Sequence, residues 1–492
     1  MTTARRKIFA NILFLGSNQG LTWLLTSVYV LVIPRYLGPA GMGILALMMA
    51  ISSVIGVLAN IGMRMFILRE VARDIEAAKI LVGPAIILST VLAIICWSIT
   101  AIILNIVNES ETTKLVMYIF AVANILGVIV TPLKAALQGM DKMHYALYES
   151  LIDKGLNTTI ALILAALNFG IVLVAASNVI TASIVVVLYF GWFFKHSSTT
   201  YNVKAENYKK LFKGSFSFLI IEISSNLYLY LDAIILAALT NETVVGYYSV
   251  PTRLFGTLMV VPMVVGQAVL PTLSRLAVDA AQENSTMYEL SRKTLSFLMC
   301  SSLPVAVGTT VMAEPIINFF YQSEFAPSIP IMIFLGWTVV PTYLGIGLVQ
   351  ILIAQNRQTA WTKLMVMAIF VNFGFNLMLI SYFQTNSGNG GVGAAMALFL
   401  TELIIGVFGV RIVGGKIINS QLILSMLKSL VAALVMGALI WPLRDTLLFI
   451  PILAGVVFYG IAIIALGLVP FDYVRMLPSL AKRLKQKFIR TR

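Results

Sequence analysis

The chain has 492 residues, of which 59% are hydrophobic and only 11% charged, and its formal net charge is +14. Soluble domains carry about 25% charged residues, so the composition excludes a large soluble domain and favours many membrane-spanning helices of roughly 20 apolar residues each. The positive charge would also suit nucleic acid. It is better explained by basic loops facing anionic lipid, and we expect no nucleic-acid partner.

Hydrophobic runs predict fourteen spans, joined by short loops on one side and longer, basic loops on the other. The positive-inside rule assigns the basic loops and both termini to the cytoplasm. On this assignment 30 of the 34 Lys and Arg residues lie inside, and the exceptions are Arg35, Lys114, Arg253 and Arg444. A wrong number of spans would break this alternation. The predicted spans are 9–33, 44–62, 80–104, 115–133, 152–168, 171–194, 215–240, 246–270, 294–318, 327–353, 363–383, 391–412, 421–441 and 446–469.

The first span begins after three basic residues at positions 5–7, as a signal peptide does. It is too long for one, and no small-residue cleavage site follows it, so we expect a retained helix. Polar side chains run along one continuous face of this helix. Polar groups within a span face the protein interior or a water-filled cavity. We therefore expect Asn18, Gln19 and Thr22 to line a polar cavity, with hydrogen bonding between helices as the alternative.

The seventh span carries two carboxylates, Glu222 and Asp232, with Asn226 on the same broad face. They lie about 15 Å apart along one helix. A charge at the bilayer centre costs about 3 kcal/mol on insertion scales, so each carboxylate must be neutral or paired. Arg253 on the next span is expected at a similar depth to Asp232, because both are about the same number of residues from the turn at Asn241 and Glu242. This allows either an ion pair with Asp232 or an arginine that faces the cavity and meets an anion. Glu222 has no evident partner and is the better candidate for a proton- or cation-coupled site.

Four other charged residues in or near spans are explained by structural roles rather than by function. Glu314 and Glu402 are expected to hydrogen-bond to neighbouring helices. Lys134 and Arg64 are expected to extend from inner helix ends toward water, as long basic side chains do.

The first twelve spans form two groups of six that both begin inside, which predicts a parallel repeat about an axis along the membrane normal. Gly43 and Gly246, 203 residues apart, each open the second span of a repeat. The tail has apolar residues at helical spacing among basic ones, which is typical of an amphipathic helix on the inner leaflet. The expected N-lobe, C-lobe, two appended spans and basic tail are residues 1–200, 201–415, 416–470 and 471–492.

The sequence has no motif for enzyme chemistry. Its two cysteines, Cys96 and Cys300, both lie in apolar runs, and no Cys/His spacing suits a metal site. We therefore expect neither a metal nor a cofactor, and a transporter rather than an enzyme.

Six segments together carry a family resemblance: Ile33–Gly43, Gly62–Ala72, Tyr230–Asp232, Gly246–Ser249, Asn372–Leu377 and Gly391–Ala395. In their order and spacing they resemble the polysaccharide-biosynthesis transporters. These are the Wzx-type oligosaccharide flippase branch of the multidrug/oligosaccharidyl-lipid/polysaccharide exporter superfamily. Each motif is loose, but the resemblance extends over essentially the whole chain.

The resemblance implies an all-α polytopic membrane protein with about fourteen transmembrane helices, in which two six-helix lobes surround a central cavity with alternating access. It implies movement of an undecaprenyl-pyrophosphate-linked oligosaccharide across the bacterial cytoplasmic (inner) membrane, for O-antigen, capsule or exopolysaccharide synthesis. Membrane lipids and polysaccharide polymerase machinery would be partners. The alternative is a cation- or proton-coupled multidrug antiporter of the same superfamily. A membrane-embedded glycan polymerase or ligase fits less well, because the outside loops are short.

Overall fold

The computed structural model describes residues 3–107, 109–197, 204–278, 285–414 and 417–468, and within them the chain is all-α, without a β-strand. The predicted amphipathic tail helix lies outside the described residues. The helices are α1 (Thr3–Asn60), α2 (Met63–Arg73), α3 (Ala77–Ile106), α4 (Glu111–Gly139), α5 (His144–Ala166), α6 (Gly170–His196), α7 (Ala205–Leu239), α8 (Glu242–Leu258), α9 (Val260–Val278), α10 (Ser285–Phe320), α11 (Ser328–Ala354), α12 (Gln358–Ser387), α13 (Gly390–Val413), α14 (Ser420–Ile440) and α15 (Phe449–Ala465).

The helix α1 covers the first two predicted spans and breaks between them. Gly38 has φ 64 and ψ −178, a conformation that residues with a Cβ rarely adopt. Pro34 and Pro39 on either side cannot donate the usual helix hydrogen bonds. The predicted outside turn is therefore a kink between two helical segments rather than an open loop.

Each of the fourteen predicted spans overlaps one of these helices, when α1 is counted as two segments and α8 with α9 as one. Among the described residues, ten helices are long and apolar enough to cross a membrane by length and composition. The prediction of an all-α polytopic membrane protein is confirmed. The short helix α2 is an addition that the hydrophobic runs did not predict, because it lies in a charged inside loop.

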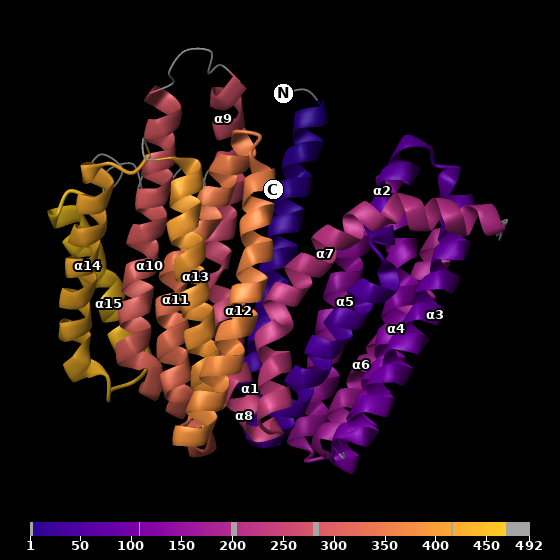
Figure 1. Cartoon of the computed structure of the whole chain (residues 1–492), viewed down its shortest axis with the longest axis horizontal. Helices are drawn as coiled ribbons and strands as arrows, with labels where there is room; N and C mark the ends of the chain where they lie inside the picture. Colours follow the sequence, from indigo (N-terminus) through magenta and orange to yellow (C-terminus); the bar gives the residue numbers. More distant parts are fainter. Residues whose placement is uncertain (1–2, 108, 198–203, 279–284, 415–416, 469–492) are drawn as a thin grey trace. The chain divides into compact units, whose positions relative to one another are not determined.

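Contacts divide the chain into two compact units: residues 1–250 with 376–394, and residues 251–375 with 395–492. These units divide the chain differently from the lobes expected from the repeat, which stay a prediction. In the first unit α4 packs against α3 and α6, and α5 against α1 and α6 (Figure 1). A buried cluster centred on Phe66, Leu133 and Tyr189 joins α2, α4 and α6.

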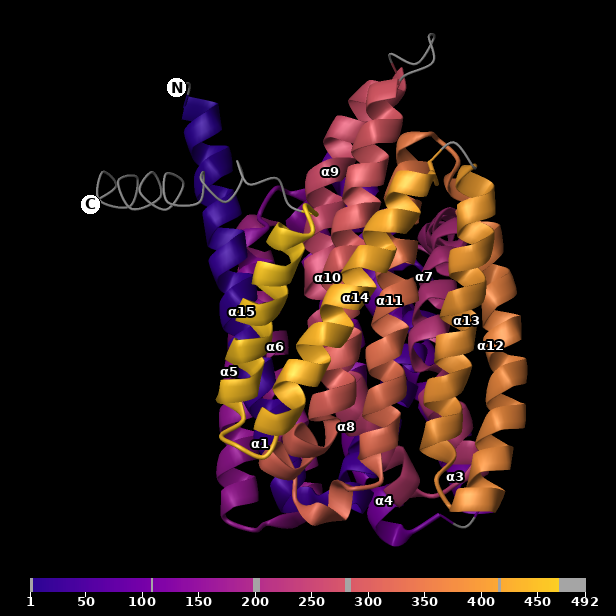
Figure 2. The same cartoon turned by 90° about the vertical axis from the view of Figure 1, so that its left-hand side faces the viewer.

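In the second unit α10 packs against α11 and α14, and α15 lies beside α14 (Figure 2). The Tyr459 hydroxyl of α15 donates to the carbonyl oxygen of Cys300 at 2.6 Å and is 2.5 Å from the Ser429 hydroxyl. The two appended spans are thus held to α10 by a buried polar contact as well as by apolar packing.

Large apolar side chains are widely exposed on the helices. Ile102 on α3 is 59% exposed, Phe370 on α12 is 72% exposed and Val456 on α15 is 67% exposed. Soluble monomers rarely expose apolar patches of this extent. This exposure agrees with helices that are long and apolar enough to cross a membrane.

The loops of the first unit gather at two ends. At one end, Ser110 at the start of α4 hydrogen-bonds to Glu242 at the start of α8, and a Cβ on Gly390 would lie 2.8 Å from Thr240. At the other end, a Cβ on Gly62 would lie 2.6 Å from the carbonyl oxygen of Ser215. The first group consists of predicted outside turns and the second of predicted inside segments. Predicted outside turns and predicted inside segments therefore lie at opposite ends of the first unit. The assignment of one end to the cytoplasm stays a prediction.

Candidate functional site

A polar cavity of about 470 Å³ lies within the first unit, between the second segment of α1 and the helices α2, α4 and α7. Eight of its ten lining residues carry polar or charged side chains. The lining residues are Ser52, Ser53, Gly56, Val57, Asn60, Arg64, Asn124, Thr131, Glu222 and Asn226. The cavity can therefore accommodate a hydrated or strongly polar group.

Two opposite charges share the wall of this cavity. Glu222 projects from α7, and Arg64 from the first turn of α2. The backbone at Gly62 explains the position of Arg64. Gly62 has φ 72 and lies so close to α7 that a Cβ would approach the nitrogen of Leu219 to 2.5 Å. Only glycine allows this contact, which sets the start of α2 directly against α7.

Amide side chains brace the cavity wall. The Asn124 amide donates to the carbonyl oxygen of Ser52 at 3.0 Å and accepts from the Trp97 indole at 3.0 Å. The Asn226 amide donates to the carbonyl oxygen of Glu222 at 3.0 Å. These bonds tie α3, α4 and α1 together and fix the Glu222 backbone.

Two polar atoms of the cavity residues remain without a hydrogen-bond partner among the described residues. They are the Asn60 Oδ1 and the Ser52 Oγ, and both are buried. The Asn60 amide nitrogen donates within its own helix, to the carbonyl oxygen of Gly56 at 2.7 Å. Buried polar atoms nearly always find a partner, ordered water included.

The residues expected to form a site are distributed over several places. Glu222 and Asn226 lie on the cavity wall. Thr22 is buried on α1, outside this set of lining residues, and its carbonyl oxygen accepts from the Thr26 hydroxyl at 2.8 Å. The side chains of Asn18 and Gln19 lie outside the described residues.

Arg64 is the cavity residue that the sequence interpretation missed. It is exposed, as expected of a basic residue at an inner helix end, and it also lines the cavity to which Glu222 contributes. Arg64 lies just beyond the end of the second hydrophobic run, so it was not among the polar residues found within predicted spans. The turn at Gly62 folds α2 back against α7, and nothing in the local sequence predicts that long-range contact.

Asp232 has two hydrogen-bond donors that the sequence did not reveal. It is 4% exposed. The Tyr248 hydroxyl donates to its Oδ2 at 3.1 Å, and the Asn376 amide donates to its Oδ1 at 2.6 Å. The carboxylate thus joins α7 to α8 and α12. Arg253 is half-buried on α8 in the second unit, and its pairing with Asp232 stays a prediction.

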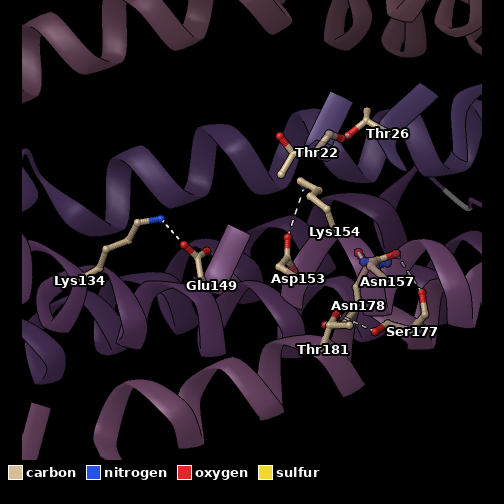
Figure 3. A network of polar contacts seen from close by, with 10 residues as sticks. All are labelled: Thr22, Thr26, Lys134, Glu149, Asp153, Lys154, Asn157, Ser177, Asn178 and Thr181. Atoms are coloured by element: carbon tan, nitrogen blue, oxygen red, sulfur yellow. Dashed lines mark hydrogen bonds and ion pairs between the residues drawn. The ribbon is translucent and has the colours of Figure 1, made fainter. Parts of the chain in front are cut away.

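A second polar network follows α5 (Figure 3). Glu149, Asp153 and Asn157 recur at steps of four residues and therefore share one helix face. The Lys134 ammonium of α4 donates to Glu149 at 2.6 Å, and the Asn157 amide donates to the Asn178 amide oxygen of α6 at 2.7 Å. Lys134 is therefore ion-paired rather than extended into water as predicted, and the network connects three helices.

The described residues contain no group of three or more His, Cys, Asp or Glu side chains that could hold a metal ion. Both cysteines are free thiols.

Comparisons with known proteins agree with this architecture. A protein of Haloferax volcanii described as a probable low-salt glycan biosynthesis flippase is 23% identical over 377 residues, which is 75% of each chain. Among solved structures, the lipid II flippase MurJ in an inward closed conformation superposes with a TM-score of 0.71 at 16% identity, covering 92% of this chain and 98% of that chain. An inward-facing multidrug resistance MATE family transporter gives a TM-score of 0.62 at 16% identity, covering 79% of this chain and 94% of that chain.

These relatives are flippases and transporters, which confirms the expectation of a transporter rather than an enzyme. The two structural similarities show a shared fold. Residues 8–277 match the family described as Polysaccharide biosynthesis protein. Because this match covers more than half of the chain, the protein belongs to that family.

Proposed function

We propose that this protein is a flippase that moves a lipid-linked oligosaccharide across the membrane by alternating access. The observation that carries the proposal is the cavity with Arg64 and Glu222 on its wall, in a chain of the polysaccharide biosynthesis family. The relatives with glycan and lipid II in their descriptions support this class of substrate. An undecaprenyl-pyrophosphate carrier is our specific expectation.

The cavity residues suit the polar head of such a substrate. A guanidinium binds phosphate through two parallel hydrogen bonds, so Arg64 is the group we assign to the pyrophosphate. Amides such as Asn60 and Asn226 can donate to and accept from sugar hydroxyls. When no substrate is bound, the Glu222 carboxylate balances the positive charge of Arg64. The acyl chain would remain in lipid.

A complementation experiment tests this function. Deletion of the gene should cause lipid-linked oligosaccharide to accumulate on the cytoplasmic leaflet and surface polysaccharide to fall. Wild-type protein should restore both, and Arg64→Ala should not. Arg73→Ala is the matched control, because Arg73 lies on the same helix with its side chain 69% exposed and bound to Glu70. Normal surface polysaccharide in the deletion strain would reject the proposal.

The second candidate is a cation- or proton-coupled multidrug antiporter. It is favoured by the similarity to the MATE fold and by a carboxylate, Glu222, on the wall of the cavity. Increased sensitivity of the deletion strain to cationic drugs, with unchanged glycan, would support this candidate instead.

We further propose a cytoplasmic (inner) membrane location with both termini cytoplasmic. A role beside polysaccharide polymerase machinery, for O-antigen or another surface glycan, is part of the same proposal. The excess of basic residues in alternate loops supports the orientation.

A further inference from the structure

The helix α7 is longer than a membrane span. Its 35 residues rise about 52 Å, whereas the hydrocarbon core of a bilayer is about 30 Å thick. The predicted span begins at residue 215, so the first turns of α7 extend beyond it at the predicted inside end. Figure 1 shows this start of α7 running across the ends of neighbouring helices, and α7 contacts α2 and α3. Residues 205–216 are called the surface segment below.

One face of the surface segment is anchored to the first unit. Leu211 and Ser215 are fully buried, and Leu211 belongs to the apolar cluster that contains Phe66. A Cβ on Gly214 would overlap the Phe66 ring, so α7 crosses α2 in direct contact. These contacts fix the rotation of the helix about its axis, and hence the side chains that its opposite face presents to the surroundings.

The opposite face carries two apolar rings beside three lysines. Phe212 is 52% exposed and Phe216 is 50% exposed, and their ring centroids lie 6.4 Å apart. Lys209, Lys210 and Lys213 are exposed as well. With about 3.6 residues per turn, the rings occupy one side of the exposed arc and the lysines the other. This division is typical of a helix that lies in the plane of a membrane interface.

The three lysines differ from other basic residues at the same end of the unit. Arg73 and Lys134 each form an ion pair with a carboxylate of the protein. Among the described residues, no such ion pair is formed by Lys209, Lys210 or Lys213. Their ammonium groups therefore remain available to an anion outside the chain.

We propose that the surface segment binds anionic phospholipid headgroups of the leaflet at this end, with the two phenylalanine rings below the headgroups and the lysines against the phosphates. Three lysines against one carboxylate, Glu206, give the segment a net charge of +2, which complements an anionic leaflet. The exposed rings favour a lipid surface over a free anion, because apolar rings are stabilised only where they leave water. The inference goes beyond the proposed function, since a membrane phospholipid is not the transported substrate.

The site is connected to the cavity through two helices. The helix α7 continues from the surface segment to Glu222 and Asn226 on the cavity wall. The helix α2, which carries Arg64, packs against α7 at Gly214. Headgroups bound to the surface segment therefore help to position both helices that carry the charged cavity residues.

Quenching by labelled lipid tests the site without any glycan. In a background with Cys96→Ser and Cys300→Ser, Phe212→Cys carries an environment-sensitive fluorophore. The purified protein is placed in nanodiscs that contain phosphatidylglycerol or phosphatidylcholine with a nitroxide near the glycerol. The anionic lipid should quench the fluorophore severalfold more strongly than the neutral lipid. Adding Lys209→Gln with Lys213→Gln should reduce quenching by the anionic lipid to the level of the neutral one.

The double variant Arg73→Gln with Lys154→Gln is the matched control. It removes the same charge from the same end, but these side chains, 69% and 52% exposed, pair with carboxylates of the protein. The control should keep the preference for the anionic lipid. Three results would overturn the proposal: equal quenching by the two lipids before any lysine is changed, as an acidic protein partner would give, a preference that survives the lysine changes, or an equal loss in both double variants. Because nothing is transported, the result is independent of whether the protein is a flippase.

Discussion

At the scale of single residues, the proposed transport depends on Glu222 and Arg64, which share one cavity wall. Glu222→Gln keeps the shape of the side chain but fixes it neutral. We expect it to impair transport without lowering the amount of protein in the membrane. If coupling runs through Glu222, the variant should also lose its response to an imposed pH or Na⁺ gradient. Wild-type rates with an unchanged gradient response would leave Glu222 as a structural residue.

Asp232 is expected to matter for stability. Asp232→Ala removes the acceptor of the Tyr248 hydroxyl and the Asn376 amide, and each hydrogen bond to a charged group contributes about 1.5–3 kcal/mol to stability. The melting temperature of the detergent-solubilised protein should therefore fall. If Arg253 pairs with Asp232, the double variant Asp232→Asn with Arg253→Gln should be milder than either single change. A double variant as impaired as the worse single variant would indicate separate roles.

At the scale of helices, the docking of α2 onto α7 depends on Gly62. Gly62→Ala would place a Cβ against the backbone of Ser215 and Leu219. Overpacking of this kind costs about 1–3 kcal/mol, so we expect a lower melting temperature and weaker transport. Gly127→Ala on α4 is the control, because a Cβ there meets nothing within 4 Å. Equal stability of the two variants would contradict the proposed docking.

The sequence predicted the spans well, because hydrophobic runs directly reflect burial in lipid. It did not predict α2 or the break between α8 and α9, which depend on local backbone turns and tertiary contacts. For the site, polarity within a span identified Glu222 and Asn226. Arg64 and the partners of Asp232 could not be predicted, because they come together through long-range contacts rather than through spacing.

At the scale of the whole molecule, the positions of the basic residues in alternate loops predict the orientation of the protein in the membrane. Reporter fusions at Lys204 and Gly388 should report inside and outside respectively. The structure places Gly388 in the turn between α12 and α13, and Lys204 directly before α7. The same side for both fusions would overturn the fourteen-span orientation.

The proposed function requires that this chain alone moves a lipid-linked oligosaccharide from one leaflet to the other. The direct measurement uses the purified protein in liposomes that contain lipid-linked oligosaccharide extracted from the deletion strain. Exposure of the glycan on the outer surface is followed over time with an impermeant glycan-modifying enzyme. Wild-type protein should speed this exposure well above protein-free liposomes, and Arg64→Ala should return it close to that background. Equal rates with and without wild-type protein would contradict the account.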